Sequence, residues 1–250
     1  MRTITSQASG KGTRDYQEDR AGIYNTGQGI LMAVFDGHGG ADVSDFCIQN
    51  LVAAYEAVKE DPTLPNGQMK LGGIFEFLST RTDEMEAGST ASIVALANNG
   101  TEALVGVLGD SPVYVKKADG TIWAAPCHNV RTNPREVDVA QARGGVVYDG
   151  YLFDGKGLTA HGIQMSRALG DKDLANVLSR EPEIFTVPID VGSWILVASD
   201  GLIDPAHKES NLEWAVIDMI EKGKSARDLV QYALAVPTDD NVSVIIAKVV

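Results

Sequence analysis

Two apolar runs in this chain have the pattern of buried strands, and each run stops at an aspartate followed by glycine. Residues 30–35 are all apolar and lead into Asp36-Gly37-His38-Gly39-Gly40, while residues 193–199 lead into Asp200-Gly201. A short continuous apolar run bounded by glycine is typical of a strand buried on both faces. The sequence therefore predicts two core strands that each carry a carboxylate at one end.

Apolar residues recur at three- and four-residue steps elsewhere, which is the pattern of amphipathic helices. This spacing predicts helices over 41–59, through 71–85 with Met85 on the apolar face, over 134–143, and in two closing segments near 212–220 and 226–233. Ser225 and Asp228 form a variant of the capping box that opens the last helix.

Shorter alternating segments predict the remaining strands, at 3–9, 21–24, 90–97, 103–108, 112–117, 121–125 and 242–249. Asn98-Asn99-Gly100, Gly109-Asp110-Ser111 and Asp119-Gly120 are turn signals, so the four middle strands are expected to form an antiparallel meander. Residues 126–162 are glycine-rich and irregular, which suggests a flap that contacts substrate. An α+β chain of this order is best buried as two packed antiparallel sheets with helices outside.

Composition narrows the class of protein. The 250 residues are 44% hydrophobic and no linker divides them, so we expect one domain over 1–250. A formal net charge of −13 argues against nucleic acid or an anionic membrane as a partner. Cys47 and Cys127 match no zinc spacing, and we expect free buried thiols in a reducing compartment. With no signal-peptide pattern or membrane-spanning run, a cytoplasmic protein is expected.

Six carboxylates stand at loop and strand ends, and together they suggest a metal site. They are Glu18, Asp19, Asp36, Asp110, Asp200 and Asp240. Each alone has an ordinary explanation: Asp36 as a turn or helix-cap residue, Glu18 and Asp19 as a solvated loop, and Asp110 as a turn former. As a set without clustered cysteine or histidine, they favour Mg²⁺ or Mn²⁺ over zinc.

The motifs resemble, in order and over nearly the whole chain, the metal-dependent protein phosphatases of the type 2C family. The motifs are Arg14-x-x-x-Glu18-Asp19, Val34-Phe35-Asp36-Gly37-His38-Gly39-Gly40, Gly109-Asp110-Ser111, Ser166-Arg167-Ala168-Leu169-Gly170-Asp171, Ala198-Ser199-Asp200-Gly201 and Asp240-Asn241. The resemblance implies a four-layer αββα β-sandwich, with two antiparallel sheets flanked by helix pairs, and a short flap subdomain.

The same resemblance implies a site with two divalent cations, Mn²⁺ or Mg²⁺. Asp36 would bridge them, the Gly37 carbonyl with Glu18 or Asp19 would complete one, and Asp200 with Asp240 would hold the other. Arg14 would bind the phosphate, and His38 would protonate the departing oxygen or, alternatively, order water near Asp36. With Asp200, the residues Asp110 and Asp204 match positions that bind a third, weaker cation.

The implied activity is hydrolysis of phosphoserine and phosphothreonine in proteins, by direct attack of a hydroxide that bridges the cations and without a phosphoenzyme. Such a protein opposes a serine/threonine kinase and is expected to be monomeric. Two alternatives stay open: a phosphatase-like fold kept as a non-catalytic binding module, and a phosphomonoesterase acting on small molecules.

Three features depart from the family pattern or lie outside it. Pro112 stands where arginine commonly follows Gly-Asp-Ser, and Cys127-His128-Asn129 replaces the usual Asp-His-Lys-like start of the flap. His128, His161 and His207 match no motif, and we expect them to be surface or loop residues. None of these departures removes a predicted cation ligand.

Overall fold

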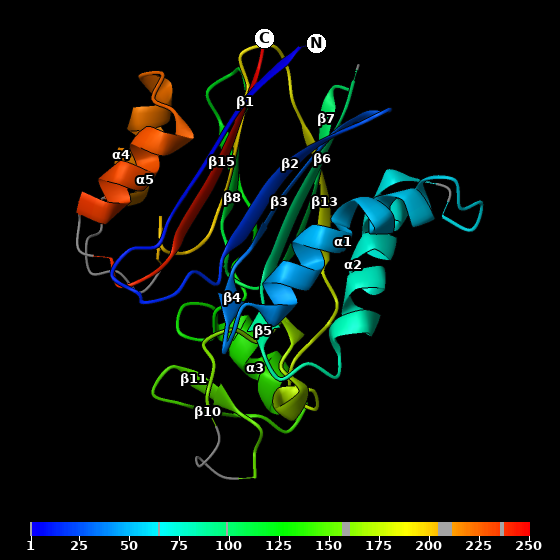
Figure 1. Cartoon of the computed structure of the whole chain (residues 1–250), viewed down its shortest axis with the longest axis vertical. Coiled ribbons are helices and arrows are strands. Elements are labelled where there is room, and N and C mark those ends of the chain that lie inside the picture. Colours follow the sequence, from blue (N-terminus) through cyan, green and yellow to red (C-terminus); the bar gives the residue numbers. More distant parts are fainter. Residues whose placement is uncertain (1, 65, 99, 157–160, 205–211, 236–237) are drawn as a thin grey trace.

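Two five-stranded antiparallel sheets pack against each other at the centre of the molecule (Figure 1). The computed structural model describes residues 2–64, 66–98, 100–156, 161–204, 212–235 and 238–250. The first sheet has the order β1 (Thr3–Gly10), β15 (Val242–Val249), β14 (Trp194–Ala198), β8 (Val113–Lys116) and β9 (Ile122–Ala124). The second has the order β13 (Glu183–Pro188), β7 (Glu102–Leu108), β6 (Ala91–Ala97), β3 (Gly29–Phe35) and β2 (Arg20–Thr26).

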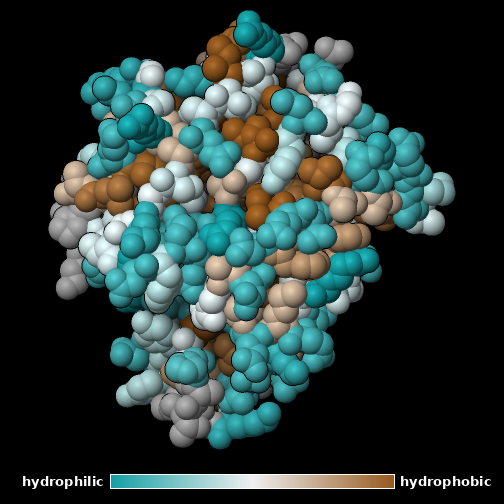
Figure 2. All heavy atoms as spheres, viewed as in Figure 1, coloured by the Kyte–Doolittle hydropathy of each residue, from teal (hydrophilic) through white to brown (hydrophobic). Residues whose placement is uncertain are grey.

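A pair of helices covers the outer face of each sheet, which confirms the predicted αββα layering. α1 (Asp42–Lys59) and α2 (Gly67–Thr82) cover the second sheet, while α4 (Leu212–Glu221) and α5 (Ala226–Ala235) cover the first (Figure 1). Hydrophilic residues cover most of the face seen in Figure 2, with separate hydrophobic groups among them. No helix within the described ranges has the length and apolar character needed to cross a membrane.

The two core strands are apolar throughout because both of their faces are buried. In β3, Met32 and Val34 pack between the sheets, while Leu31 and Phe35 pack against the helices. β14 alternates in the same way between the inter-sheet core and the core beneath α4 and α5. Burial on both faces holds the ends of these strands firmly in place.

The described part of the flap segment, residues 126–156 and 161–162, extends from one end of the sandwich (Figure 1). It contains α3 (Pro134–Ala142), β10 (Val146–Tyr148) and β11 (Tyr151–Phe153). A separate small core joins it to the chain around η1 (Lys172–Leu174), with Ala140, Leu152 and Val177 buried in it. Three two-residue strands, β4 (Gly37–His38), β5 (Gly88–Ser89) and β12 (Leu169–Gly170), form a ribbon between flap and sandwich.

The predicted four-stranded meander is wrong at its middle. β6 pairs with β7 and β8 pairs with β9, but β7 and β8 belong to different sheets. Gly109-Asp110-Ser111 is therefore a crossover between sheets, because the strand that follows it completes the opposite face of the core. The sequence patterns also missed β13, β10 and β11. α2 ends at Thr82, so Met85 packs on the core from beyond the helix.

The prediction for the thiols is confirmed for one of the two cysteines. Both are free, and Cys47 is buried in α1, where burial raises the pKa of its thiol to about 12. Cys127 is only half-buried, so it does not belong to the core.

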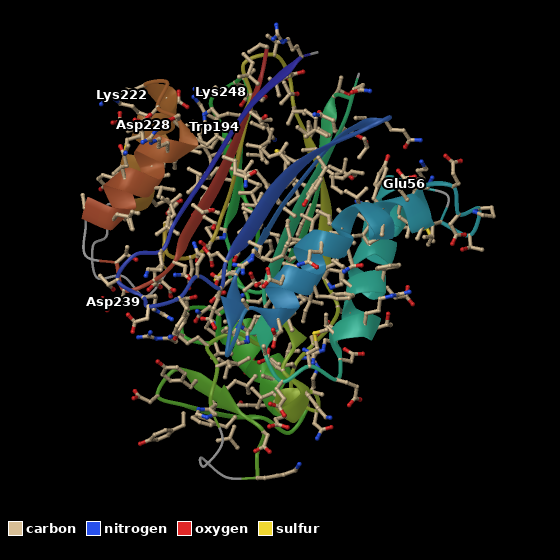
Figure 3. All side chains as sticks on the ribbon, in the orientation of Figure 1. Glu56, Trp194, Lys222, Asp228, Asp239 and Lys248 are labelled. Carbon is tan, nitrogen blue, oxygen red and sulfur yellow. The ribbon has the colours of Figure 1, made fainter. Side chains whose placement is uncertain are left out.

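The predicted capping box at α5 is present. The Ser225 N–H donates to Asp228 Oδ2 at 2.8 Å, and the Asp228 N–H donates to Ser225 Oγ at 3.4 Å. We expect Ser225→Ala to lower the free energy of unfolding by about 1 kcal/mol, because it leaves a helix N–H without its acceptor. Lys222→Ala, on the same side of the molecule (Figure 3), is the control and should change it by less than about 0.5 kcal/mol. Urea unfolding measures both, and equal values would contradict the assignment.

Candidate metal centre

Five of the predicted carboxylates meet in one cleft at the end of the sandwich where β3 and β14 finish. The cleft has a volume of about 250 Å³. Its lining includes Arg14, Glu18, Asp36, Gly37, His38, Asp110, Asp200 and Asp240, together with Gln164 from beyond the flap. Asp36 and Asp200 come from opposite sheets, so the packing of the two sheets brings the two strand ends together.

A larger cavity of about 690 Å³ lies between the second sheet and the helices α1 and α2. Its lining is mostly apolar, for example Leu31, Val58 and Leu71, and it contains none of the predicted site residues. Of these two, the smaller cleft is therefore the candidate functional site, because it combines a concave shape with convergent charged groups.

Hydrogen bonds fix the backbone at the end of β3. The Asp36 N–H donates to Thr90 Oγ1 at 3.1 Å, and the Asp36 carbonyl accepts from the Thr90 N–H at 2.9 Å. Ser89 Oγ donates to the same carbonyl at 3.1 Å. A Cβ on Gly37 would lie 2.6 Å from the Glu18 carbonyl oxygen, so glycine is required for this close approach.

Glu18 and Asp19 are both buried, each held by different partners. The Gly40 N–H donates to Glu18 Oε1 at 2.6 Å, and the Glu18 N–H donates to Asn241 Oδ1 at 2.7 Å. Asp19 lies behind the lining of the cleft, where its Oδ2 accepts from Ser199 Oγ at 2.7 Å. Its Oδ1 is buried without a hydrogen-bond partner among the described residues.

The carboxylates repel one another, and burial adds to the cost of ionising them. Burial, followed by the charges of Asp19 and Asp200, raises the pKa of Asp36 well above its usual value. Burial, followed by the charges of Asp110 and Asp240, does the same to the pKa of Asp200. Burial also raises the pKa of Asp19 to about 6. Binding of a cation to such a cluster is therefore favourable, because the cation relieves the repulsion between the carboxylates.

Arg14 is engaged by the segment that precedes β15. Its Nη2 donates to Asp240 Oδ2 at 2.9 Å, and its Nε donates to the carbonyl of Asp239, which lies in that loop (Figure 3), at 2.5 Å. The guanidinium is partly exposed at the cleft, so it can offer further N–H groups to an anion there.

His38 is held by Asp171, to which the sequence reasoning gave no role. Its Nε2 lies 2.8 Å from Asp171 Oδ2, and Asp171 is itself buried. Burial lowers the pKa of His38, but the hydrogen bond and charge of Asp171 outweigh it and the net pKa is raised. A Cβ on Gly88 would lie only 2.2 Å from His38 Nε2, so glycine makes room for the pair. In the sequence, the one indication of this role was that Asp171 is the final residue of the Ser166–Asp171 motif.

Asp110 is buried beside the cleft, and Asp204 lies within electrostatic reach of it. Asp110 Oδ2 accepts from Asn129 Nδ2 at 2.8 Å, while its Oδ1 is buried without a hydrogen-bond partner in the described part of the chain. Burial raises the pKa of Asp110, the hydrogen bond from Asn129 opposes that rise, and the net pKa is raised. Eight of the ten predicted site residues thus line the cleft, Asp19 lies behind it and Asp204 lies within electrostatic reach, and the role of each stays a prediction.

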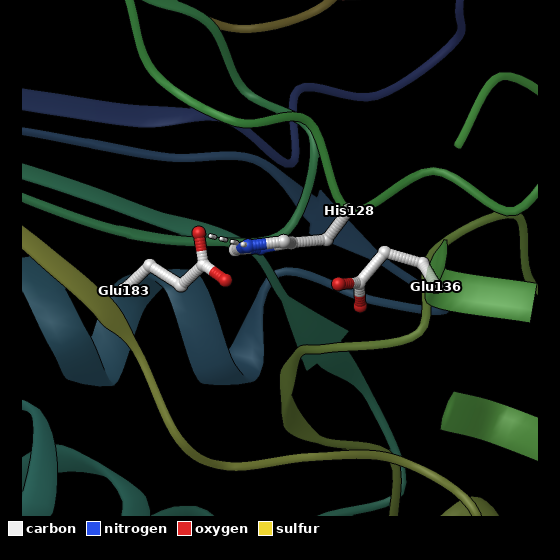
Figure 4. A group of neighbouring side chains, drawn as sticks. All are labelled: His128, Glu136 and Glu183. Atoms are coloured by element: carbon white, nitrogen blue, oxygen red, sulfur yellow. Dashed lines mark ion pairs between the residues drawn. The ribbon is translucent and has the colours of Figure 1, made fainter. Parts of the chain in front are cut away.

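His128 was expected at the surface, but its side chain is fully buried next to Glu136 and Glu183 (Figure 4). Its burial is compatible with a polar ring because Nδ1 accepts a hydrogen bond from the Gly109 N–H. His161 is exposed, as expected, whereas His207 lies outside the described residues. Arg167 joins the two glutamates, with Nη2 2.8 Å from Glu136 Oε1 and 3.2 Å from Glu183 Oε1.

The group of His128, Glu136 and Glu183 has the composition of a metal site but not its chemistry. Burial, followed by the charge of Arg167, lowers the pKa of His128 to about 4, so the ring is neutral at pH 7. The Gly109 N–H donates to His128 Nδ1 at 3.0 Å, and the ring hydrogen is therefore on Nε2, which faces Glu183. Nε2 therefore has no lone pair to offer a metal, and both carboxylates already pair with the Arg167 guanidinium. The cluster instead joins the flap to β13.

Known proteins resemble this chain over most of its length. A family model described as protein phosphatase 2C matches residues 9–242. "Probable protein phosphatase 2C 11" of Arabidopsis thaliana is 29% identical over 240 residues, which cover 94% of this chain and 62% of the relative. The chain therefore spans less than two thirds of that relative's length.

Two solved structures share the fold. One described as a C. elegans sex determining protein has a TM-score of 0.80 and 29% identity, and the match covers 98% of this chain and 64% of the other. The second is the catalytic domain of the serine threonine protein phosphatase PstP in complex with two manganese ions. Its TM-score is 0.62 at 23% identity, with 99% and 98% of the two chains covered, and this likeness concerns the fold alone.

Removal of one carboxylate should stabilise the protein when no metal is present. We expect Asp36→Asn to raise the free energy of unfolding in chelator by about 1–3 kcal/mol at pH 7, because it removes a buried like charge. The wild type should gain about 2.7 kcal/mol at a free Mn²⁺ concentration of about 100 times Kd, and the variant much less. The exposed Asp173→Asn is the control, and a metal response equal to wild type in Asp36→Asn would contradict the site.

The pH dependence of the metal-free protein should follow from the raised pKa of Asp19. Between 3.8 and about 6 the folded protein binds more protons at this group than the unfolded chain does. Stability in chelator is therefore expected to fall as the pH rises through this window. Urea unfolding at several pH values measures this trend, and saturating Mn²⁺ should reverse it at the upper end, because the cations favour the ionised carboxylates.

Proposed function

Because this chain belongs to the protein phosphatase 2C family, we propose that it is a metal-dependent phosphatase that hydrolyses phosphoserine and phosphothreonine esters of proteins. The observation that carries the proposal is the gathering of Asp36, Asp200 and Asp240 with Glu18 in one cleft beside an arginine. A scaffold protein that had lost catalysis would have no need to keep such a costly cluster of buried carboxylates.

The donor set fits two divalent cations, Mn²⁺ or Mg²⁺, and a weaker third one. Oxygen ligands dominate the cleft, and buried carboxylate oxygens of Asp19 and Asp110 have no hydrogen-bond partner among the described residues. Asp36, with Gly37, Asp200 and Asp240, would hold the first two cations, helped by Glu18 or Asp19. Asp110 and Asp204 would hold the third. Such cations supply activation of water and neutralise the charge of the phosphoryl group.

The protein's own residues would orient the ester and protonate its leaving group. Arg14 would bind two phosphoryl oxygens through the planar fork of its guanidinium and align the phosphorus for attack by water. His38, held by Asp171 at 2.8 Å, would give its proton to the departing serine or threonine oxygen. The flap segment, whose neighbour Gln164 lines the cleft, would contact the peptide around the phosphorylated residue.

We further propose the cellular setting that these features support. The net charge of −13 is a poor match to nucleic acid or an anionic membrane, and the two free cysteines suit a reducing compartment. Residues 1–250 would act as one catalytic domain, as a cytoplasmic monomer in signalling that opposes a serine/threonine kinase.

The direct test is phosphate release from a phosphothreonine peptide. We expect release with Mn²⁺, none with excess chelator, and a loss of at least about 1,000-fold in kcat/KM for Asp36→Asn, since that change weakens binding of both cations. Asp173→Asn should keep wild-type activity. A comparison with p-nitrophenyl phosphate tests the small-molecule alternative. Equal or higher kcat/KM on small esters than on phosphopeptides would oppose a protein substrate.

Arg14 gives a second test, because its contact with Asp240 could serve either the substrate or the carboxylate alone. We expect Arg14→Lys to lower kcat/KM for the phosphopeptide by about 10- to 100-fold with an unchanged Mn²⁺ requirement, because lysine lacks the planar fork. The exposed Arg227→Lys on α5 is the matched control. If Arg14→Lys changed only the Mn²⁺ dependence, Arg14 would be a partner of Asp240 and not a phosphate ligand.

A further inference from the structure

Asp110 lies in a connection between two strands, outside the hydrogen-bonded ladder of either sheet. It lies in the crossover between β7 and β8, which leaves one sheet and enters the other. The start of the flap holds this crossover from the side: the His128 N–H donates to the Gly109 carbonyl at 3.1 Å, and the Gly109 N–H donates to His128 Nδ1 at 3.0 Å. From the sandwich, Ser92 Oγ donates to the carbonyl of the next residue, Ser111, at 2.7 Å. The position of Asp110 therefore depends on the flap as well as on the second sheet.

Asn129 makes this dependence specific to one carboxylate oxygen. Its Nδ2 donates to Asp110 Oδ2 at 2.8 Å, and its Oδ1 accepts the Arg131 N–H at 2.9 Å. The backbone donor fixes which end of the amide faces Asp110. Both Asn129 and Asp110 are buried, and the other carboxylate oxygen, Oδ1, has no hydrogen-bond partner among the described residues. One oxygen is thus held while the other stays available to a ligand.

The same amide also reaches the substrate side of the cleft. Asn129 Nδ2 lies 3.4 Å from Gln164 Oε1, and Gln164 lines the cleft beside the carboxylates. An amide nitrogen carries two hydrogens, so it can serve Asp110 and Gln164 together. Because the amide is neutral, it orients Asp110 without cancelling its negative charge. A lysine or arginine at this position would cancel that charge.

We propose that Asn129 is a positioning residue of the flap that presents Asp110 to a third divalent cation and links this cation to Gln164 in the lining of the cleft. The inference rests on the metal centre of the proposed function. A bound cation would hold Asp110 more firmly, and Asn129 would pass this restraint to Gln164 and the flap. The charge at position 129 would in turn set how tightly the third cation binds.

A charge series at position 129 tests the proposal through Mn²⁺ binding, measured by calorimetry and by the electron paramagnetic resonance signal of free Mn²⁺. We expect Asn129→Lys to weaken the weakest Mn²⁺ site by about 100-fold, and Asn129→Leu by about tenfold, since leucine only removes the hydrogen bond. Asn129→Asp should bind as tightly as the wild type or more tightly, because it adds a carboxylate. The two tighter sites should be unchanged throughout.

The matched control is Asn133→Ala, which removes a helix cap of α3 in the same segment but touches no carboxylate of the cleft. It should lower stability without changing any Mn²⁺ affinity. Thermal unfolding in chelator checks that each variant folds, and Asn129→Leu, whose side chain has the same branching and number of heavy atoms, carries the test if Asn129→Lys does not fold. A purely structural role for Asn129 predicts losses of similar size in all three variants, including Asn129→Asp, and would overturn the proposal.

Hydrogen exchange tests the link to the flap. Saturation of the weakest Mn²⁺ site should slow amide exchange in residues 126–156 of the wild type, but not in Asn129→Leu. Unchanged Mn²⁺ affinities in the whole series, or a wild type that binds only two Mn²⁺ ions, would overturn the inference and leave the phosphatase activity standing. A wild type that binds no Mn²⁺ and releases no phosphate would instead overturn the proposed function itself.

Discussion

Mutual repulsion among buried carboxylates is the constraint on which the rest of this structure depends. Asp36 and Asp200 end strands of opposite sheets, and burial with neighbouring negative charge raises the pKa of each. The fold must hold these groups together although they repel, so it needs a rigid frame on every side. This repulsion strengthens the binding of cations, because each bound cation relieves it in addition to forming its own bonds.

The rigid frame comes from strands that are buried on both faces. β3 and β14 each contribute to two separate cores, so neither can slide without disturbing packing on both sides. Short side chains then fix the ends of the strands: Thr90 and Ser89 hold the backbone of Asp36, and Ser199 holds Asp19. Asp36 and Asp19 are thus placed by packing and by neutral hydrogen bonds, which leaves their negative charge available to cations.

The flap is joined to the sandwich by a different kind of acidic cluster, in which an arginine side chain pairs with both carboxylates. Arg167 lies between Glu136 and Glu183, and His128 beside them is neutral because it is buried next to that guanidinium. Two hydrogen bonds between His128 and Gly109, one from backbone to backbone and one from the Gly109 N–H to the imidazole, connect this cluster to the crossover that carries Asp110. The two acidic clusters thus differ in how their arginine is placed: Arg167 is buried between both glutamates, whereas Arg14 pairs with Asp240 at the partly exposed edge of the cleft.

The sequence by itself determined the strands and helices with strong periodicity, the α5 cap and the carboxylates at the strand ends, since each signal is local. Only the tertiary structure decided that β7 and β8 lie in different sheets, because a turn and a crossover have the same local signal at Gly109-Asp110-Ser111. It also decided that His128 is buried and that Asp171 holds His38, contacts between residues far apart in the chain. Spacing along the chain encodes faces and ends, whereas the partner of a buried polar group depends on which elements pack together.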